Sequence, residues 1–313
     1  MTRKIAFLFP GQGSQFVGMG KSLMDEFPEA RKRVQEACDS LGFDIGKLIV
    51  DGPEEELKAT YNTQPAILLV SVIALEALKE RTGVEGAITA GHSLGEFSAC
   101  HAAGALSFQD AIRLVRKRGE LMQSAVPLGV GAMAAIIGLS AAEVEALCGE
   151  VDGEVAPANF NSPEQTVIAG KTEAVEKAAT LAKEKGAKKV AHLPVSAPFH
   201  TSMMKPAREG LAQFMENMTI NDPRFPIIRN VDAGLSTTAD QVRQGLIEQV
   251  TGCVKWVDSM ARLAQEGVAE GLEIGPGKVL TGLMKRIDRS FKIRAIGEAP
   301  DIQSYKEESD GQA

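Results

Sequence analysis

One serine lies in a short segment whose pattern is typical of nucleophilic catalysis. Residues 91–95 read GHSLG and match G-x-S-x-G, with Ser93 at the centre. A short apolar run precedes the segment and a stretch of helical period follows it. Glycines on both sides permit a sharp strand-to-helix turn that exposes the hydroxyl at a helix N-terminus, where negative charge is stabilised. The pattern predicts a serine nucleophile; the alternative is a Gly/Ser turn without chemistry.

A serine hydroxyl needs a base to take its proton, and the chain has four histidines that could serve. His92 adjoins the serine on the turn, where neighbouring side chains diverge. His101 falls on the following helix and His192 inside an expected strand, which favours structural roles for both. His200 follows Ala-Pro-Phe in an expected loop, from which its side chain could reach across a cleft. Its position favours His200, although a lone histidine in such a loop is more often structural.

Two glycine-rich segments superficially suggest phosphate binding. Residues 9–15 read FPGQGSQ, but Phe16 stands where G-x-G-x-x-G needs its third glycine. Residues 275–278 read GPGK, but no glycine lies five residues before Gly277, as a nucleotide-phosphate loop requires. Both segments therefore argue against a nucleotide site. Residues 11–13 form either a tight turn after a strand or an oxyanion hole, in which backbone N–H groups stabilise a carbonyl oxygen under attack.

Several short blocks together resemble one known family. Residues 91–96 (GHSLGE) are similar to the nucleophile segment of malonyl-CoA:acyl carrier protein transacylases and of polyketide synthase acyltransferase domains. The other blocks occur in the family's order: FPGQGSQ at 9–15, QPA at 64–66, RG at 118–119, NSP at 161–163, APFH at 197–200 and GPGKVL at 275–280. The match spans residues 4–297. The chain is therefore identified as a member of this family.

The resemblance implies roles for the catalytic residues. It makes Ser93 the nucleophile and His200 the base, and it forms the oxyanion hole from the backbone N–H groups of Gln12 and Leu94. A hydrolase triad would orient its histidine with a carboxylate. The family instead uses a backbone carbonyl, here that of Gln249, so no catalytic carboxylate is expected.

Arg118 carries the expected substrate specificity. Malonyl differs from acetyl by a carboxylate, which a guanidinium can clamp with two parallel hydrogen bonds. The resemblance assigns this role to Arg118. The residue belongs, however, to a basic run at 113–118 on an expected helix, and such runs are usually solvated.

The resemblance also assigns the acyl pocket. Met133 matches a position that lines this pocket in the family, with a plain core role as the alternative. Asn161 and Gln249 complete the substrate-binding residues. In the related polyketide domains an aliphatic residue after the serine and a Phe before the histidine accompany malonyl rather than methylmalonyl. Leu94 and Phe199 occupy those two places here, so we expect malonyl.

The elements that must position these residues follow an α/β pattern. Apolar runs of strand length at 5–9 and 86–90 alternate with helical patterns at 64–81 and 96–103. Such alternation predicts a parallel sheet covered by helices. Between 132 and 195 the expected order is β-α-β-β-α-β, which is ferredoxin-like, with strands at 132–139, 154–159, 165–170 and 189–195 and helices at 141–149 and 172–185.

The fold class is therefore α/β, with an α/β-hydrolase-like large domain and an inserted ferredoxin-like small domain. We expect the large domain to be discontinuous, over residues 1–127 and 197–303, and the insert to span 128–196. The large domain should add strands near 225–231 and 271–274. Residues 304–313 are polar and expected to be disordered.

Composition excludes several classes. With 313 residues, 44% hydrophobic residues and a net charge of −7, the chain has the composition of a globular protein and not of a nucleic-acid binder. The apolar run at 5–10 is too short for a signal peptide, and the one at 65–78 is interrupted and short of a membrane span. Four scattered cysteines favour neither zinc nor disulfides. We expect a cytoplasmic, free-standing protein, as a monomer.

The expected reaction moves malonyl from malonyl-CoA to the phosphopantetheine thiol of acyl carrier protein, through a malonyl-Ser93 ester and without a metal or other cofactor. Acyl carrier proteins are acidic, so a basic docking patch is expected. Candidates are Lys188, Lys189, Lys285 and Arg286; the alternative is scattered solvated charge.

Two other functions remain possible from the residues. An α/β-hydrolase esterase shares G-x-S-x-G, but it typically places its histidine near the C-terminus after an Asp or Glu. Here the last histidine is His200, and no His-Gly-Gly-Gly segment precedes the serine. A non-catalytic malonyl sensor would not need to keep Ser93, His200 and Arg118 together.

Overall fold

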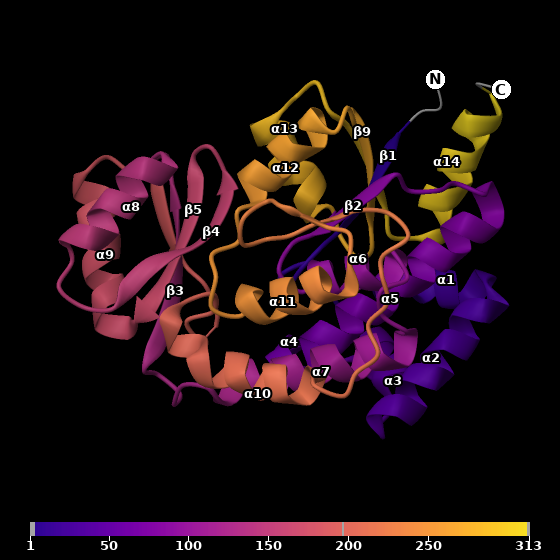
Figure 1. Ribbon diagram of the computed structural model, residues 1–313, viewed down its shortest axis with the longest axis horizontal. Helices are drawn as coiled ribbons and strands as arrows, with labels where there is room; N and C mark the ends of the chain where they lie inside the picture. Colours follow the sequence, from indigo (N-terminus) through magenta and orange to yellow (C-terminus); the bar gives the residue numbers. More distant parts are fainter. Residues whose placement is uncertain (1–3, 196, 312–313) are drawn as a thin grey trace.

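The computed structural model describes residues 4–195 and 197–311. Figure 1 shows a large unit of helices around a central sheet, and a smaller unit beside it that contains β3 to β5 with α8 and α9. The arrangement confirms the predicted α/β class, with a ferredoxin-like unit inserted between two parts of the large one.

The large sheet has the strand order β10-β9-β1-β2-β7-β8, and every pair is parallel except β7 with β8. Its strands are β1 (Ile5–Phe9), β2 (Ile88–Gly91), β7 (Ile227–Ile228), β8 (Leu235–Ser236), β9 (Glu270–Ile274) and β10 (Lys292–Ile296). Phe7 and Phe9 enter the core on one face of β1, while Ala6 and Leu8 enter the core on the other. Because both faces are covered at the centre of the sheet, β1 is apolar throughout. The carboxyl ends of β1 and β2 therefore meet at one buried edge, where Ser93 follows.

Helices cover both faces of this sheet. α5 is buried along almost its whole length on one side, and α12 and α13 pack on the other. The helices of the large unit are α1 (Lys21–Glu26), α2 (Pro28–Leu41), α3 (Ile45–Asp51), α4 (Glu54–Lys58), α5 (Thr60–Thr82), α6 (Gly95–Ala102), α7 (Phe108–Ser124), the 3-10 turn η1 (Ser202–Met204), α10 (Lys205–Met215), α11 (Ala239–Gln249), α12 (Trp256–Gln265), α13 (Val279–Ile287) and α14 (Ala299–Asp310).

The expectation that the apolar run at 65–78 is too short for a membrane span is corrected by α5, the helix that contains this run. With 23 residues the helix is long and apolar enough to cross a membrane by length and composition, and it is the one such helix in the described part of the chain. However, 89% of its most apolar window is buried inside the protein. α5 is therefore the central core helix of the large unit.

The small unit follows the predicted β-α-β-β-α-β order. It contains β3 (Gly131–Ile137), α8 (Ala141–Glu150), β4 (Val155–Ser162), β5 (Gln165–Lys171), α9 (Thr172–Glu184) and β6 (Lys189–His192). Its sheet is antiparallel with the order β4-β5-β3-β6, and α8 and α9 share a separate core with it. The limits of the insert at 128 and 196 stay a prediction: they fall in the connections that flank β3 and β6, and Ser196 lies outside the described residues.

Backbone hydrogen bonds join the small unit to the large one. Val254 donates to the carbonyl of Ala158, and Phe160 donates to the carbonyl of Val254, both at 2.9 Å. The edge strand β4 is thereby tied to the segment that follows α11. This places the small sheet beside the carboxyl edge of the large sheet, so both units can contribute to one site.

The expectation of disorder over 304–313 is wrong as far as Asp310. α14 runs from Ala299 to Asp310, and its N-terminus is closed by a reciprocal capping box between Glu298 and Asp301. Ile302 is buried in the main core and Tyr305 packs against it. The prediction of disorder is wrong because most residues of this segment are polar and lie on the outer side of the helix. Residues 312–313 lie outside the described part of the chain.

Candidate active site

Ser93 occupies a strained turn between β2 and α6. Its φ of 51° is in the left-handed region, which residues other than glycine rarely adopt. The two glycines of the motif are sterically required: a Cβ on Gly91 would lie 1.9 Å from the carbonyl carbon of Gly95, and a Cβ on Gly95 would lie 2.1 Å from the oxygen of Phe9. Asn230 holds the turn, since its Oδ1 accepts from Ser93 N and its Nδ2 donates to the Gly91 oxygen, each at 2.7 Å.

His200 meets the nucleophile from the opposite side of the cleft. Its Nε2 lies 2.8 Å from Ser93 Oγ, and its Nδ1 lies 2.9 Å from the backbone oxygen of Gln249. A carbonyl only accepts, so Nδ1 carries the hydrogen and Nε2 is free to accept the serine proton. Burial, together with the charge of Arg118, lowers the pKa of His200 to about 3. The imidazole is therefore neutral and able to act as a base near neutral pH.

Arg118 is buried beside the same serine. One guanidinium nitrogen, Nη2, donates to Ser93 Oγ at 3.1 Å and to Gln249 Oε1 at 2.7 Å, and Nη1 donates to Gln64 Oε1 at 2.9 Å. The guanidinium also stacks over the Phe97 ring, 5.1 Å from its centroid. Burial lowers the pKa of Arg118 to about 10, which leaves the group charged at neutral pH.

Helical spacing explains why Arg118 is the buried member of the basic run. The buried face of α7 includes Ala111, Val115 and Met122, and residue 118 falls on this face by its spacing. Arg113, by contrast, is exposed. The Nε atom of Arg118 is buried with no acceptor in the described part of the chain. The guanidinium therefore keeps unused capacity to donate hydrogen bonds.

The loop after β1 approaches the nucleophile turn closely. A Cβ on Gly11 would lie 2.4 Å from the backbone oxygen of His92. Across residues 4–195 and 197–311, the backbone N–H groups of Gln12 and Leu94 have no hydrogen-bond acceptor. Leu94 is the N-cap of α6, where the helix dipole favours negative charge. These two donors are therefore available for an oxyanion, and their role as the oxyanion hole stays a prediction.

A small pocket of about 100 Å³ lies beside Ser93 and His200. Both units contribute to its lining, which consists of Gln12, His92, Ser93, Met133, Asn159, Leu193, Val195, Phe199 and His200. Met133 reaches it from β3 and Phe199 from the loop before His200. Met133, Leu193, Val195 and Phe199 form an apolar part of its wall, and its size suits a short acyl group. Its chemistry is that of acyl transfer through a serine ester.

The comparisons with known proteins agree with this geometry. The model of the acyl transferase domain family matches residues 6–306. The chain belongs to the acyl transferase family. It is 48% identical to the malonyl CoA-acyl carrier protein transacylase of Bacillus subtilis (strain 168), over 98% of this chain and 99% of that protein. It is 46% identical to the protein of the same name from Escherichia coli (strain K12), over 94% and 96%.

Solved structures extend the likeness to the whole fold of this acyl transferase. A complex of a type II polyketide synthase acyl carrier protein with its malonyl-transacylase is 44% identical with a TM-score of 0.95, over 97% of this chain and 99% of that one. The malonyl CoA-acyl carrier protein transacylase from Coxiella burnetii is 41% identical, also with a TM-score of 0.95, over 97% of each chain.

In the acyl transferase the other histidines have partners other than the Ser93 hydroxyl. His92 Nε2 lies 2.7 Å from Asn161 Oδ1, and burial lowers the pKa of His92. His101 bonds the backbone oxygen of Leu106, and His192 is half-exposed near Glu176. Asn161 thus contacts His92 and is not among the pocket-lining residues. A role for Asn161 toward substrate stays a prediction.

Three of the four basic residues expected to bind a carrier lie along one region of the acyl transferase. Lys189 pairs in register with Ile137, which in turn pairs with Gln165, and Arg286 donates to Gln165 Oε1 at 2.7 Å. Lys285 is exposed next to Arg286 on α13. Lys188 is partly neutralised, because its Nζ lies 2.8 Å from Glu164. Lys188, Lys189 and Arg286 thus lie near the edge between the small unit and α13, whereas Lys285 lines a hollow beside β9 and β10.

Sequence reasoning missed several residues of the acyl transferase site. Asn159 lies two residues before Asn161 on β4, but irregularities at Pro157/Asn159 and Phe160/Ser162 break the alternation of this strand, so the spacing gave no signal. Leu193 and Val195 follow the end of β6 with the same spacing. Gln64 belongs to the QPA block but had no assigned function. Asn230 had no local signal, because it acts on the nucleophile turn from 137 residues further along the chain.

Proposed function

We propose that this protein transfers malonyl groups from malonyl-CoA to the phosphopantetheine thiol of acyl carrier protein, supplying malonyl-carrier for fatty acid synthesis. One observation carries the proposal: Ser93 Oγ lies 2.8 Å from His200 Nε2 and 3.1 Å from Arg118 Nη2. A nucleophile between a neutral base and a buried cation suits an acyl group that bears its own negative charge close to the reacting carbonyl. In malonyl a single CH2 separates the two carbonyl carbons.

In the first half-reaction His200 Nε2 takes the proton from Ser93 Oγ as this oxygen attacks the thioester carbonyl. The backbone N–H groups of Gln12 and Leu94 stabilise the oxyanion of the tetrahedral intermediate. The Gln249 carbonyl, 2.9 Å from Nδ1, stabilises the imidazolium. The C–S bond then breaks, and the thiolate of coenzyme A takes the proton from Nε2. A malonyl ester on Ser93 and a neutral His200 remain.

The second half-reaction repeats these steps with another thiol. His200 takes the proton of the carrier's phosphopantetheine thiol, whose sulfur attacks the malonyl ester. Ser93 leaves as an alkoxide and recovers the proton from His200. Both half-reactions are substitutions at an acyl carbon without oxidation or reduction, and backbone N–H groups stabilise the oxyanion, so we propose a mechanism without a metal or redox cofactor.

Arg118 and the pocket walls account for the choice of acyl group. The Arg118 guanidinium would pair with the free carboxylate of malonyl, which acetyl lacks. Met133 and Phe199 bound a pocket of about 100 Å³, which favours malonyl over acyl groups with a branch at the central carbon. Leu94 follows the nucleophile and is fully buried, in agreement with the same preference.

The proposal is tested by the intact mass of the protein after mixing with malonyl-CoA, beside acetyl-CoA and a Ser93→Ala control. We expect a malonyl adduct on the wild type, little adduct with acetyl-CoA and none on Ser93→Ala. The adduct should disappear when carrier protein with its phosphopantetheine arm is added. Steady release of coenzyme A into water without an adduct would indicate an esterase instead. Binding of malonyl-CoA without adduct or release would indicate a sensor.

The proposal includes docking of the acidic carrier on Lys189, Lys285 and Arg286. The complex of a similar malonyl-transacylase with its carrier protein supports such a partner. Reversing charge in the double variant Lys285→Glu and Arg286→Glu should raise the KM for carrier about tenfold, because each exposed charge pair contributes a fraction of a kcal/mol to about 1 kcal/mol. Formation of the malonyl adduct should be unchanged.

The matched control for docking reverses two exposed lysines on helices remote from α13, Lys32 on α2 and Lys47 on α3 (Figure 1). This variant has the same net charge as the double variant and should use carrier like the wild type. Equal loss of carrier use in both variants would mean that the effect comes from net charge and not from docking at α13. Loss of the adduct itself in the α13 variant would contradict a docking role.

We also propose that the protein acts in the cytoplasm as a monomer. The apolar helix α5 supports the location, because its most apolar window is 89% buried within the fold. The active site supports a monomer, because a single chain supplies all of its catalytic groups. These groups contact one another and are Ser93, His200, Gln249 and Arg118.

A further inference from the structure

Glu96 is a buried carboxylate beneath the nucleophile turn that the proposed chemistry does not use. It lies on α6 three residues after Ser93 and is 2% exposed. Its Oε2 accepts two hydrogen bonds, from Gln249 Nε2 at 2.7 Å and from the backbone N–H of Asn230 at 3.1 Å. A charge this deeply buried is costly unless hydrogen bonds or opposite charges stabilise it. Both partners of Glu96 contact the catalytic groups.

The first partner, Gln249, uses both ends of its side-chain amide. Nε2 donates to the Ser93 backbone oxygen at 2.8 Å and to Glu96, while Oε1 accepts from Arg118 Nη2 at 2.7 Å. A carboxylate can only accept, so it selects the amide orientation in which the NH2 group faces it. The opposite orientation would turn the NH2 group toward the guanidinium. Together with the Ser93 carbonyl, Glu96 thereby favours the orientation in which an oxygen faces Arg118.

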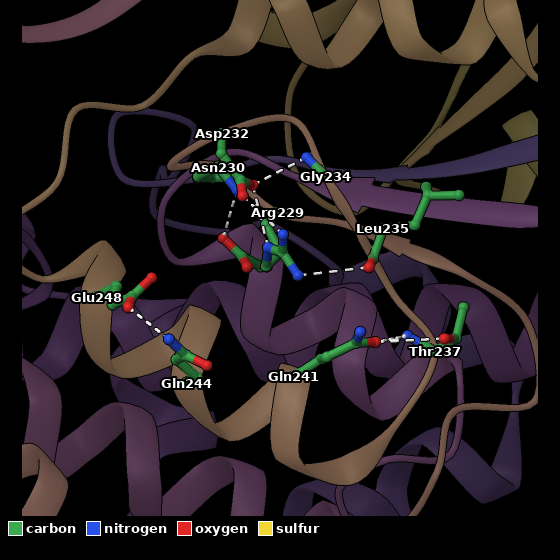
Figure 2. A network of polar contacts seen from close by, with 10 residues as sticks. Arg229, Asn230, Asp232, Gly234, Leu235, Thr237, Gln241, Gln244 and Glu248 are labelled. Carbon is green, nitrogen blue, oxygen red and sulfur yellow. Dashed lines mark hydrogen bonds and ion pairs between the residues drawn. The ribbon is translucent and has the colours of Figure 1, made fainter.

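The second partner, Asn230, holds the nucleophile turn with its side chain. It lies in the turn between β7 and β8, which is closed by the ion pair of Arg229 with Asp232 and by the hydrogen bond from Gly234 N to Asp232 Oδ1 (Figure 2). Because the Asn230 backbone N–H donates to Glu96, the carboxylate links this turn to α6. The Glu96 side chain thus contacts both Asn230, which holds the turn at Ser93, and Gln249, which holds Arg118.

We propose that Glu96 is a positioning residue that sets the preference for a carboxylate-bearing acyl group, by holding the Gln249 amide so that its oxygen fixes the Arg118 guanidinium beside Ser93. The inference rests on the proposed function, because it acts through the contact of Arg118 with malonyl. Glu96 also supports the nucleophile turn through Asn230, an effect that every acyl donor would share.

The ionisation of Glu96 provides a specific readout. The charged groups that face it are Arg118 from α7 and Arg229 from the turn after β7, and the Cys100 thiol lies near it on its own helix. Burial raises the pKa of Glu96 to about 7, while hydrogen bonds from Gln249 and Asn230 and the two arginines oppose this rise. Above this pH the carboxylate is charged and holds Gln249 strongly; below it, the charge is lost. Malonyl preference should therefore fall between pH 8 and pH 6.

The experiment measures kcat/KM for acylation of Ser93 by malonyl-CoA and by acetyl-CoA, from pH 6 to pH 8.5. Their ratio cancels steps that both donors share, including those of His200. In Glu96→Gln we expect the malonyl constant to fall about thirtyfold at pH 8 and the acetyl constant about threefold, a tenfold loss of preference. The ratio should rise with pH in the wild type and be flat in Glu96→Gln. Glu96→Asp, which keeps the charge, should restore part of the preference.

Glu273 offers a matched control. It is also a fully buried carboxylate, and it accepts from the backbone N–H groups of Leu280 and Thr281 at the start of α13. Glu273→Gln should lower thermal stability but leave the malonyl-to-acetyl ratio and its pH dependence as in the wild type. A role of Glu96 in folding alone would make Glu96→Gln behave in the same way, and this result would overturn the inference.

The remaining outcomes are also decisive. If Glu96→Gln does not fold, Glu96→Asp decides instead: its shorter side chain changes the contact with Gln249, and an unchanged malonyl-to-acetyl ratio in this variant contradicts the inference. A wild type that forms no malonyl adduct would refute the proposed function and, with it, the premise of this inference. Normal adduct formation in the wild type with an unchanged ratio in Glu96→Gln would refute the positioning role alone.

Discussion

Replacing His200 by alanine is expected to slow formation of the malonyl-Ser93 ester about a thousandfold. The imidazole lies 2.8 Å from Ser93 Oγ and carries its hydrogen on the opposite nitrogen, which donates to the Gln249 carbonyl. A positioned general base typically contributes a factor of about 10² to 10⁴. The oxyanion donors and Arg118 stay in place, so binding of malonyl-CoA should be little changed. Single-turnover mass measurements give the rate, and calorimetry gives the affinity.

The backbone at His200 calls for a second variant. Its φ of 62° is left-handed, a conformation that asparagine tolerates much better than alanine. His200→Asn should therefore keep the loop and still lose the base, with a similar loss of rate. His192→Ala is the matched control, because His192 is half-exposed on β6 and its side chain lies near Glu176. A His200→Asn protein that folds and keeps a tenth or more of the wild-type rate would exclude His200 as the base.

The local parts of the site could be predicted from the sequence because they depend on a few adjacent residues. The turn at Ser93 needs glycines at fixed spacing, since a Cβ on Gly91 or Gly95 would overlap the backbone. The small unit could be predicted for a similar reason: its strands and helices each carry a clear hydrophobic period. α14 could not, because Ile302 and Tyr305 provide only a narrow apolar stripe in a polar segment.

The supporting contacts could not be predicted because they join distant segments through groups without a sequence signature. Every residue has a backbone carbonyl, so nothing in the sequence by itself marks Gln249 as the partner of His200. Glu96 belongs to the recognised block GHSLGE, but its partners lie 134 and 153 residues away. Arg118 is an intermediate case. Its helical spacing from Val115 and Met122 places it on the buried stripe of α7, unlike the exposed Arg113. The neighbouring basic residues make the whole run resemble a solvated surface, so composition alone does not reveal this spacing.

Replacing Arg118 by alanine should reduce the preference for malonyl-CoA over acetyl-CoA by about a hundredfold or more. Truncating one partner of a buried, hydrogen-bonded charge pair typically costs about 2–5 kcal/mol, and in the malonyl complex this cost falls on the substrate carboxylate. Acetyl has no carboxylate to lose a partner, so its acylation rate should fall much less. The ratio of kcat/KM values for Ser93 acylation by the two donors measures the effect.

Two further variants separate recognition of the carboxylate from support of the fold. Arg118→Lys keeps a positive charge but not the planar fork that donates to both Gln64 and Gln249, so it should recover only part of the preference. Arg113→Ala, at an exposed position on the same helix, should match the wild type for both donors. Equal losses for malonyl and acetyl in Arg118→Ala would mean that the guanidinium only supports the buried amides. A selective loss, graded from lysine to alanine, requires that it contacts the malonyl carboxylate, because no other part of the two donors differs.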